Sequence, residues 1–321
     1  MSLLPPVTEG FHRLVRALGV NGPPPRGEIL LPVGSARLRI NLSEAEGGRP
    51  GKLLLECAVA REALQQDHAL RACMLRNMST ALTRWVYLNQ RQTIVLRAAV
   101  PGPSHRDLVW SVPLAATAAT LMAREAATEG AAVAQDAGGL SSTPYDPTGT
   151  LPDLASSLAT APWEPNSRSL QRWSEGLHAL SVARSDHGLS AEYPFAAIAP
   201  STQKQLRGLV ATPGVADIRL AIHATHPLAG LGVLVVSTVP VHHEHSTLAL
   251  RILNELNRVE IKRSVKTITT GAWCLEPQEK RFAHVSFWPA ARLDSSMIPD
   301  LLSREEARLR WVHEILTVMA R

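Results

Sequence analysis

The 321-residue chain is poor in the residues on which several classes of protein depend. Its three cysteines form no C-x-x-C pair, which argues against a disulfide-rich secreted protein and against a cysteine-ligated zinc site. Aromatic residues make up 4% of the chain and are sparse for a surface that stacks nucleic-acid bases. No apolar run reaches the roughly 20 residues of a membrane-spanning helix. No secretion signal is evident at Met1, so we expect a reduced, cytoplasmic protein that does not enter a membrane.

The motifs of the common enzyme classes are missing as well. The chain has no G-x-x-x-x-G-K phosphate loop, no G-x-S-x-G nucleophile elbow and no H-E-x-x-H zinc helix. It also has no G-x-G-x-x-G turn after an expected strand. These absences favour a protein without a catalytic site and without a cofactor.

Positive charge is in slight excess and is carried mainly by arginine. Lysine and arginine number 33 against 28 acidic residues, and the sequence pI is about 9.4. Arginine suits bidentate contacts to carboxylates. A net charge of +5 over this length is a weak indication of nucleic-acid binding. We therefore expect another protein or peptide as partner, with acidic segments favoured, and self-association stays open.

Proline, glycine and serine crowd the middle of the chain and divide it in two. Residues 132–166 hold acidic side chains and no basic one, a composition that does not bury enough apolar surface to form a core. We expect an acidic linker over 132–166, a first domain over 1–131 and a second domain over 167–321.

The same order of elements is predicted in both halves: helix, three strands, helix, two strands, helix. Residues 36–42 show the strand pattern, because Leu38 and Ile40 alternate with Arg37 and Arg39. The first half is expected to have helices near 11–18, 67–85 and 115–129 and strands near 28–31, 36–42, 52–60, 93–100 and 107–113. The second half is expected to have helices near 167–182, 246–259 and 303–319 and strands near 188–198, 215–224, 231–239, 268–275 and 281–289. The expected fold class is α+β, with two similar domains, each an antiparallel sheet with helices on one face.

Three sequence patches of the second half are similar to those of a known family. They are Ala191–Phe195, Gly271–Cys274 and Val285–Pro289. Together with the repeated element order, they resemble the bacterial type III secretion chaperone-like superfamily, which includes YbjN-type proteins. The resemblance covers residues 167–321 best and reaches the first half through element order alone. It implies a non-enzymatic domain that binds an extended polypeptide, with two copies in one chain resembling a covalent pseudo-dimer.

The strand patterns place several arginines on the sheet faces that point away from the helices. These are Arg37, Arg39, Arg97 and Arg219. On the last strand Ala283, Val285 and Phe287 are expected in the core, which leaves Phe282 and Trp288 outside. A face that combines arginine with large aromatic residues is a candidate partner-binding surface. The alternative is an ordinary solvated face.

A second candidate site is a cluster of histidines. His242, His243 and His245 follow one another closely, with His223 upstream, and neutral imidazoles are good ligands for zinc or copper. The alternative is a solvated turn between a strand and a helix. The leading hypothesis is thus a protein-binding module, of the kind represented by a secretion-chaperone-like protein or an adaptor. The alternative hypotheses are a metal-dependent enzyme that uses the histidine cluster and a nucleic-acid binder.

Overall fold

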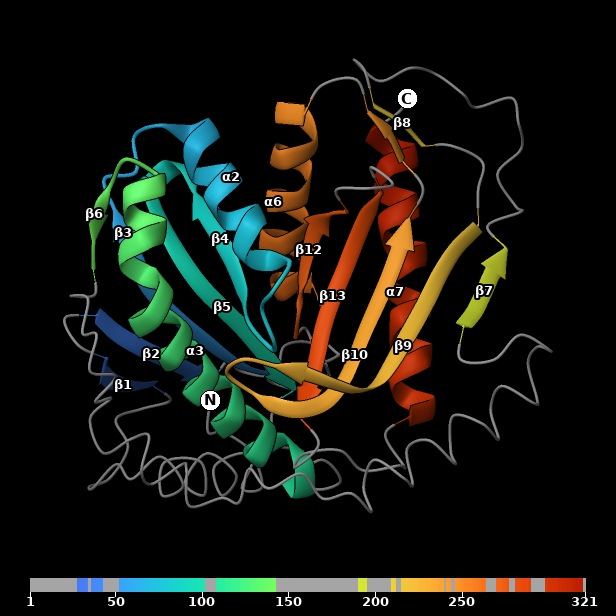
Figure 1. The fold of residues 1–321 in the computed structure, drawn as a ribbon, viewed down its shortest axis with the longest axis horizontal. Helices are drawn as coiled ribbons and strands as arrows, with labels where there is room; N and C mark the ends of the chain where they lie inside the picture. The colour runs from blue at the N-terminus through green and yellow to red at the C-terminus, as the bar shows by residue number, and fades with distance from the viewer. Residues whose placement is uncertain are drawn as a thin grey trace, which may run out of the picture.

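The computed structural model describes twelve stretches of the chain. They are residues 28–33, 36–42, 52–101, 108–142, 190–194, 209–211, 215–239, 241–243, 246–263, 270–276, 281–289 and 298–319. Within these ranges the chain forms two antiparallel sheets flanked by helices, the α+β class expected from the sequence (Figure 1). The expected helices near 11–18 and 167–182 lie outside the described residues.

The first sheet has the strand order β1-β2-β3-β5-β4. Its strands are β1 (Glu28–Val33), β2 (Ala36–Leu42), β3 (Lys52–Arg61), β4 (Arg84–Leu88) and β5 (Thr93–Pro101), with the short β6 (Leu140–Ser141) paired to β3. Its helices are α2 (Gln66–Asn77) and α3 (Leu108–Asp136), and a 3-10 turn, η1 (Asn89–Arg91), joins β4 to β5. The burial of β3 alternates, so Leu53, Leu55 and Cys57 face the core beneath α3.

The second sheet has the order β12-β13-β10-β9-β7. Its strands are β7 (Ser190–Pro194), β9 (Val215–His226), β10 (Gly230–Val239), β12 (Ala272–Leu275) and β13 (Phe282–Pro289). The strands β8 (Leu209–Ala211) and β11 (Val241–His243) pair separately, and the helices are α6 (Ser246–Arg263) and α7 (Ile298–Met319). β10 lies in the middle of the sheet, as its apolar sequence allows.

The two sheets share one topology and one register. Numbered along the chain within each half, both sheets read 1-2-3-5-4 from one edge to the other. A row of paired residues crosses the first sheet as Leu38, Cys57, Leu96 and Trp85. The matching row of the second sheet is Ile218, Ser237, His284 and Trp273. The two tryptophans therefore occupy equivalent places on equivalent strands.

Two element boundaries of the first half differ from the predictions. The helix predicted over 67–85 ends at Asn77, and Arg84–Leu88 is a strand, so β4 and β5 form the hairpin. The predicted strand over 107–113 is instead the beginning of α3. The cause is that short apolar runs fit a helix or a strand equally well, and partners across the sheet decide between them. α3 also continues to Asp136, inside the predicted linker, while 143–166 lies outside the described residues.

Side-chain amides cover the backbone at one edge of each sheet. Asn77 on α2 accepts the N–H of Trp85 at 2.7 Å and donates to its carbonyl oxygen at 3.0 Å. Asn254 on α6 does the same for Tyr87, at 2.9 and 3.0 Å, and so reaches from the second half to the edge of the first sheet. Asn257 pairs in this way with Trp273 at 2.7 and 2.8 Å. Each amide takes the place of a neighbouring strand, so the β4 and β12 edges cannot pair with another chain there.

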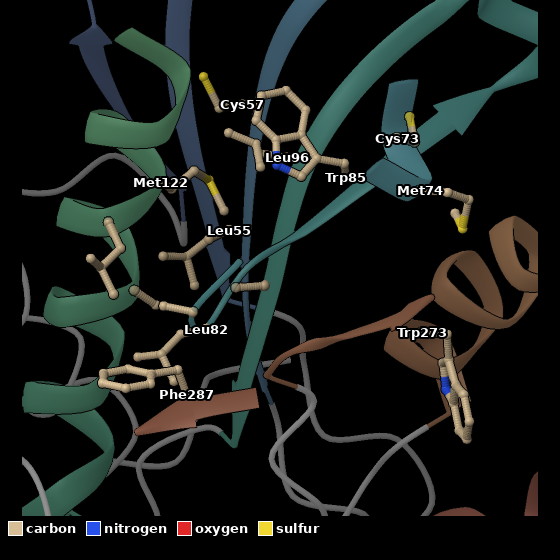
Figure 2. Close-up of a cluster of buried hydrophobic side chains, with 14 of the residues drawn as sticks. Leu55, Cys57, Cys73, Met74, Leu82, Trp85, Leu96, Met122, Trp273 and Phe287 are labelled. Atoms are coloured by element: carbon tan, nitrogen blue, oxygen red, sulfur yellow. The ribbon is translucent and has the colours of Figure 1, made fainter. Parts of the chain in front are cut away.

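The three cysteines are buried and free. Burial raises the thiol pKa of Cys57 and Cys274 to about 12 and that of Cys73 above its ordinary value. Cys57 lies beside Leu55 under α3, and Cys73 lies on α2 (Figure 2). Their thiols are therefore core side chains and poor nucleophiles.

We predict that Asn254→Ala lowers the free energy of unfolding by about 2–3 kcal/mol, because the buried N–H and C=O of Tyr87 lose their partner. Urea unfolding of the full chain measures this change. Glu255→Ala, at the exposed neighbouring position of α6, is the control and is expected to change stability by less than about 1 kcal/mol. Equal effects in the two variants would contradict the edge-sealing role.

Candidate functional site

The arginine row of the first sheet exists, but its exposure changes from one strand to the next. Arg39, Glu56, Arg97 and Arg84 are paired in register across β2, β3, β5 and β4 on one face. The side chain of Arg39 is 53% exposed, that of Arg97 12% and that of Arg84 0%. At the β4 end of this face Arg84 contacts Asn257 and Glu260 of the second half, whereas Arg39, at the β1–β2 end, is the most exposed of the three arginines.

Most of these arginines already have carboxylate partners. Arg39 lies 2.6 Å from Glu28, and Arg97 Nε donates to Glu56 at 2.6 Å. Arg37 is exposed and makes no ion pair with any described residue. Arg219 holds the position on β9 that Arg39 holds on β2, but its side chain lies outside the described residues. The candidate surface is thus reduced to Arg37, Arg39 and their surroundings.

The two aromatic residues predicted to line this surface are in the core. Phe282 is 0% exposed and Trp288 2%, and His284 and Ser286 on the same side of β13 are buried too. Phe282 and Trp288 were expected outside because only one face of β13 was assigned to the core, but both faces are covered. On their side His284 lies 3.4 Å from Glu305 of α7, and on the opposite side Ala283 and Phe287 are buried as expected. Val285, expected in the core, is half-buried on the opposite face. An arginine–aromatic platform for single-stranded nucleic acid is therefore not formed by these residues.

The candidate metal ligands are divided between the two ends of β10. His223 on β9 lies beside Gly232 and Val233, near the beginning of β10. Val241–His243 follows the other end of β10, after Val239. Six residues of strand separate the two positions, about 20 Å at strand spacing, so His223 does not converge with His242 and His243. His245 lies outside the described residues, and within them no group of three or more His, Cys, Asp or Glu side chains could hold a metal ion.

The open end of the first sheet is its β1 edge. Among the described residues no strand pairs with the outer side of β1, which ends the sheet. Leu30 on β1 is 49% exposed and pairs in register with Arg39, so an apolar side chain lies beside two cations. We call Leu30, Arg37, Arg39 and the outer backbone of β1 the β1 edge surface.

The hairpin register identifies the backbone groups at this edge. Two residues separate the paired Val33 and Ala36, and the pair that closes such a turn exchanges hydrogen bonds. Counting back in steps of two, the N–H groups of Glu28 and Leu30 point away from β2, and Pro32 holds the third outward position. Proline has no N–H and is typical of an edge strand at such a position. The surface thus offers two donors and neighbouring carbonyl acceptors over Glu28–Leu31.

A buried ionic cluster of Arg84, Glu260, Glu305 and Arg308 joins the two halves. Arg84 Nη1 lies 2.9 Å from Glu260 Oε2, and Arg308 Nε lies 2.5 Å from Glu260 Oε1. Arg308 also donates to Glu305. Burial opposes ionisation of Glu260, but Arg308 and Arg84 outweigh burial and lower its pKa to about 2. Two arginines and two glutamates balance in charge, and the first half supplies one of the four groups.

Residue types of a catalytic triad meet next to this cluster but are not arranged as one. Ser237 Oγ donates to Glu305 Oε2 at 2.7 Å, and His284 Nδ1 lies 3.4 Å from the same oxygen. The serine therefore binds the carboxylate rather than the imidazole that would have to activate it. All three side chains are sealed from solvent, and burial lowers the pKa of His284. The arrangement supports packing and not nucleophilic catalysis.

A second buried carboxylate holds a loop of the first half that contacts the second. Glu125 on α3 accepts hydrogen bonds from Thr80 and Thr83 and from the N–H of Ala81. On its other side the loop 79–83 accepts the N–H of Phe287 at Ala81, 3.1 Å away. Burial outweighs the hydroxyl donors and raises the pKa of Glu125 to about 7.

Sequence reasoning found Arg37 and Arg39 and missed the residues that join the halves. Arg84 lies within the helix predicted over 67–85, and Glu260 belongs to no sequence motif. No described helix combines the length and the apolar character that crossing a bilayer requires. Comparisons with protein-family models, with curated proteins and with solved structures find no match.

We predict that Arg84→Met lowers the free energy of unfolding by about 3–5 kcal/mol, because one buried positive charge is removed from a balanced cluster. Arg97→Met, at the position directly opposite on β5, is the control. It removes a partly exposed arginine with one carboxylate partner and is expected to cost about 1 kcal/mol. Guanidinium unfolding that finds the same loss in both variants would refute the role of the cluster.

We also predict a pH-dependent contribution of Glu125 to stability. Its pKa is about 7 in the folded chain, against an ordinary value of 4.5, so the folded state binds the proton more tightly than the unfolded state does. Protonated Glu125 makes its full contribution to the free energy of unfolding below about pH 4.5. This contribution falls by about 3 kcal/mol in total as the pH rises to about 7. Glu125→Gln should remove this dependence, whereas Glu255→Gln, at an exposed position of α6, should keep it. Thermal unfolding measured from pH 5 to pH 8 tests both variants; an identical pH profile in Glu125→Gln and the unmodified chain would contradict the assignment.

Proposed function

We propose that this chain is a non-enzymatic protein-binding module that accepts an extended, acidic segment of another protein as an added strand at the β1 edge surface. The proposal rests on the contrast between the sheet edges. Asn77 and Asn254 close the β4 edge and Asn257 closes the β12 edge, whereas β1 and β7 end their sheets without a partner strand among the described residues. Of these two edges, β1 is the one beside which exposed arginines, Arg37 and Arg39, are described. A free edge binds an extended chain through main-chain hydrogen bonds.

The side chains beside β1 give the surface its preference. Arg37 and Arg39 are exposed on the face that also carries Leu30. A bound strand presents alternate side chains to that face, so a segment with acidic residues at every second position places carboxylates near both guanidinium groups. Glu28 already neutralises part of Arg39, which makes Arg37 the stronger determinant of partner charge.

The length of the paired segment is limited by Pro32. Outward N–H groups are available at Glu28 and Leu30, and Pro32 cannot extend the ladder. A bound segment would therefore pair over about four residues of β1. This short pairing indicates a reversible complex whose affinity depends on side-chain contacts as well as on the backbone. The resemblance to secretion chaperone-like proteins, which implies binding of an extended polypeptide, agrees with this function.

We predict that the full-length protein binds a fluorescent eight-residue peptide of alternating valine and glutamate, and that Arg37→Glu/Arg39→Glu weakens binding at least about tenfold. Fluorescence anisotropy at several salt concentrations measures both affinity and salt dependence, which should be smaller in the variant. Arg251→Glu/Arg258→Glu, which changes net charge equally on α6, should bind as the unmodified chain does.

Two further probes separate strand addition from simple charge attraction. The same peptide N-methylated at alternate residues keeps its charge and cannot form the ladder, so it should not bind. A peptide with glutamate replaced by lysine should not bind either. Equal binding of the methylated peptide, or equal loss in the Arg251→Glu/Arg258→Glu control, would overturn the proposed function.

A further inference from the structure

The turn between β9 and β10 docks on the first half through one histidine. His226, the last residue of β9, is buried, and its Nε2 lies 2.7 Å from the carbonyl oxygen of Ser79. Its other ring nitrogen, Nδ1, accepts the N–H groups of Leu228 at 3.1 Å and Ala229 at 3.2 Å. One imidazole therefore shapes its own turn and links that turn to the loop 79–83 of the other half.

These three bonds fix the protonation state of the ring. Nδ1 accepts two N–H groups, so it carries no hydrogen, and Nε2 carries the hydrogen that it donates to Ser79. A second proton on Nδ1 would turn an acceptor into a donor that faces two other donors. The neutral ring fits the site, and the charged ring does not fit without breaking the bonds to Leu228 and Ala229.

The surroundings of the ring add to the cost of a positive charge. The His226 ring lies 5.2 Å from the Phe287 ring, which points toward Leu82 in the shared core (Figure 2). On α3, Arg124 donates to the carbonyl oxygen of Leu228 at 3.2 Å and brings a like charge to the turn. The other titratable groups of α3 near this junction are Glu125, which is bound to the loop, and Glu129, which is paired with Arg76.

Within the described stretches, no other titratable group faces the ring from the elements packed against it. The loop 79–83 has none, and His284 on β13 is on the face opposite to Phe287. Burial lowers the pKa of His226 below its ordinary value of 6.5. The neutral ring therefore makes its full contribution to the free energy of unfolding above about pH 6.5. This contribution is lost as the pH falls through the lower pKa of the folded state.

We propose that His226 is an acid-operated latch of the β9–β10 turn, whose protonation at Nδ1 releases the Leu228 and Ala229 amides from the ring. The Nε2–H bond to the carbonyl oxygen of Ser79 is kept, because a charged ring still donates from Nε2. The latch is independent of the β1 edge surface. Its opening frees the Leu228 and Ala229 amides, while the bond to Ser79 and the ionic cluster at Arg84 still hold the halves together. The result is a local loosening of the turn under mild acid.

Hydrogen exchange of the full chain tests the latch. After correction for intrinsic rates, the protection of the Leu228 and Ala229 amides should fall about tenfold between pH 7 and pH 5. His226→Gln should show no such fall, because its amide accepts and donates but does not titrate in this range. His68→Gln, at an exposed position of α2, should behave as the unmodified chain does at these two amides.

Protection that is unchanged in the unmodified chain, or that falls equally in His226→Gln, would overturn the latch. If His226→Gln does not fold, NMR of the His226 ring in the unmodified chain decides. The latch requires a hydrogen on Nε2 and none on Nδ1 at pH 7, and a titration midpoint that coincides with the loss of protection at Leu228 and Ala229. A ring protonated at Nδ1 at pH 7, or one that titrates without affecting these amides, would exclude it.

Discussion

Charge balance in the buried junction between the two halves constrains the whole molecule. Glu260 can remain ionised in the interior because Arg84 reaches it from the first half and Arg308 from α7. An isolated buried charge costs several kcal/mol, so neither half could keep its part of the cluster in the same geometry alone. The ionic cluster therefore fixes the relative position of the two sheets, and the neighbouring contacts are built around that position.

The contacts on either side of the cluster are reciprocal. The carbonyl oxygen of Ile261, near the end of α6, accepts a hydrogen bond from Lys52 of the first sheet. The carbonyl oxygen of Ala81, in the loop after α2, accepts the N–H of Phe287 of the second sheet. Each half thus places the end of one helix on the sheet of the other. In Figure 1, α2 and α6 stand side by side between the two sheets.

The sequence pattern was sufficient for the strands whose two faces differ. Leu38 and Ile40 are buried and Arg37 and Arg39 exposed, as alternation predicts, because one side of β2 meets the core and the other meets water. The element order and the α+β class followed from the same patterns. The exposure of Arg37 and Arg39 could be predicted because, on a strand with alternating burial, charged side chains occupy the face that meets water.

Alternation fails where both faces of a strand are covered. β13 is buried on nearly every residue, so Phe282 and Phe287 gave no indication of which side the helices occupy. The burial of His284 does not follow from its own strand, because its neighbours Glu305 and Arg308 come from a helix some twenty residues later. Asn254 and Asn257 could have been noticed as polar residues three apart among the apolar positions of α6, a spacing that puts both on one face. Their backbone partners, however, belong to strands that only the tertiary fold brings near.

Because all three thiols are buried, their reactivity reports local unfolding of the regions that surround them. Cys57 is buried between the first sheet and α3. Cys73 is buried on α2, and Cys274 is buried on β12, the edge strand of the second sheet that Asn257 closes. An alkylating reagent can reach each sulfur only when its surroundings part. The order in which the three sites become modified therefore reports which layer of the molecule separates first, without any introduced label.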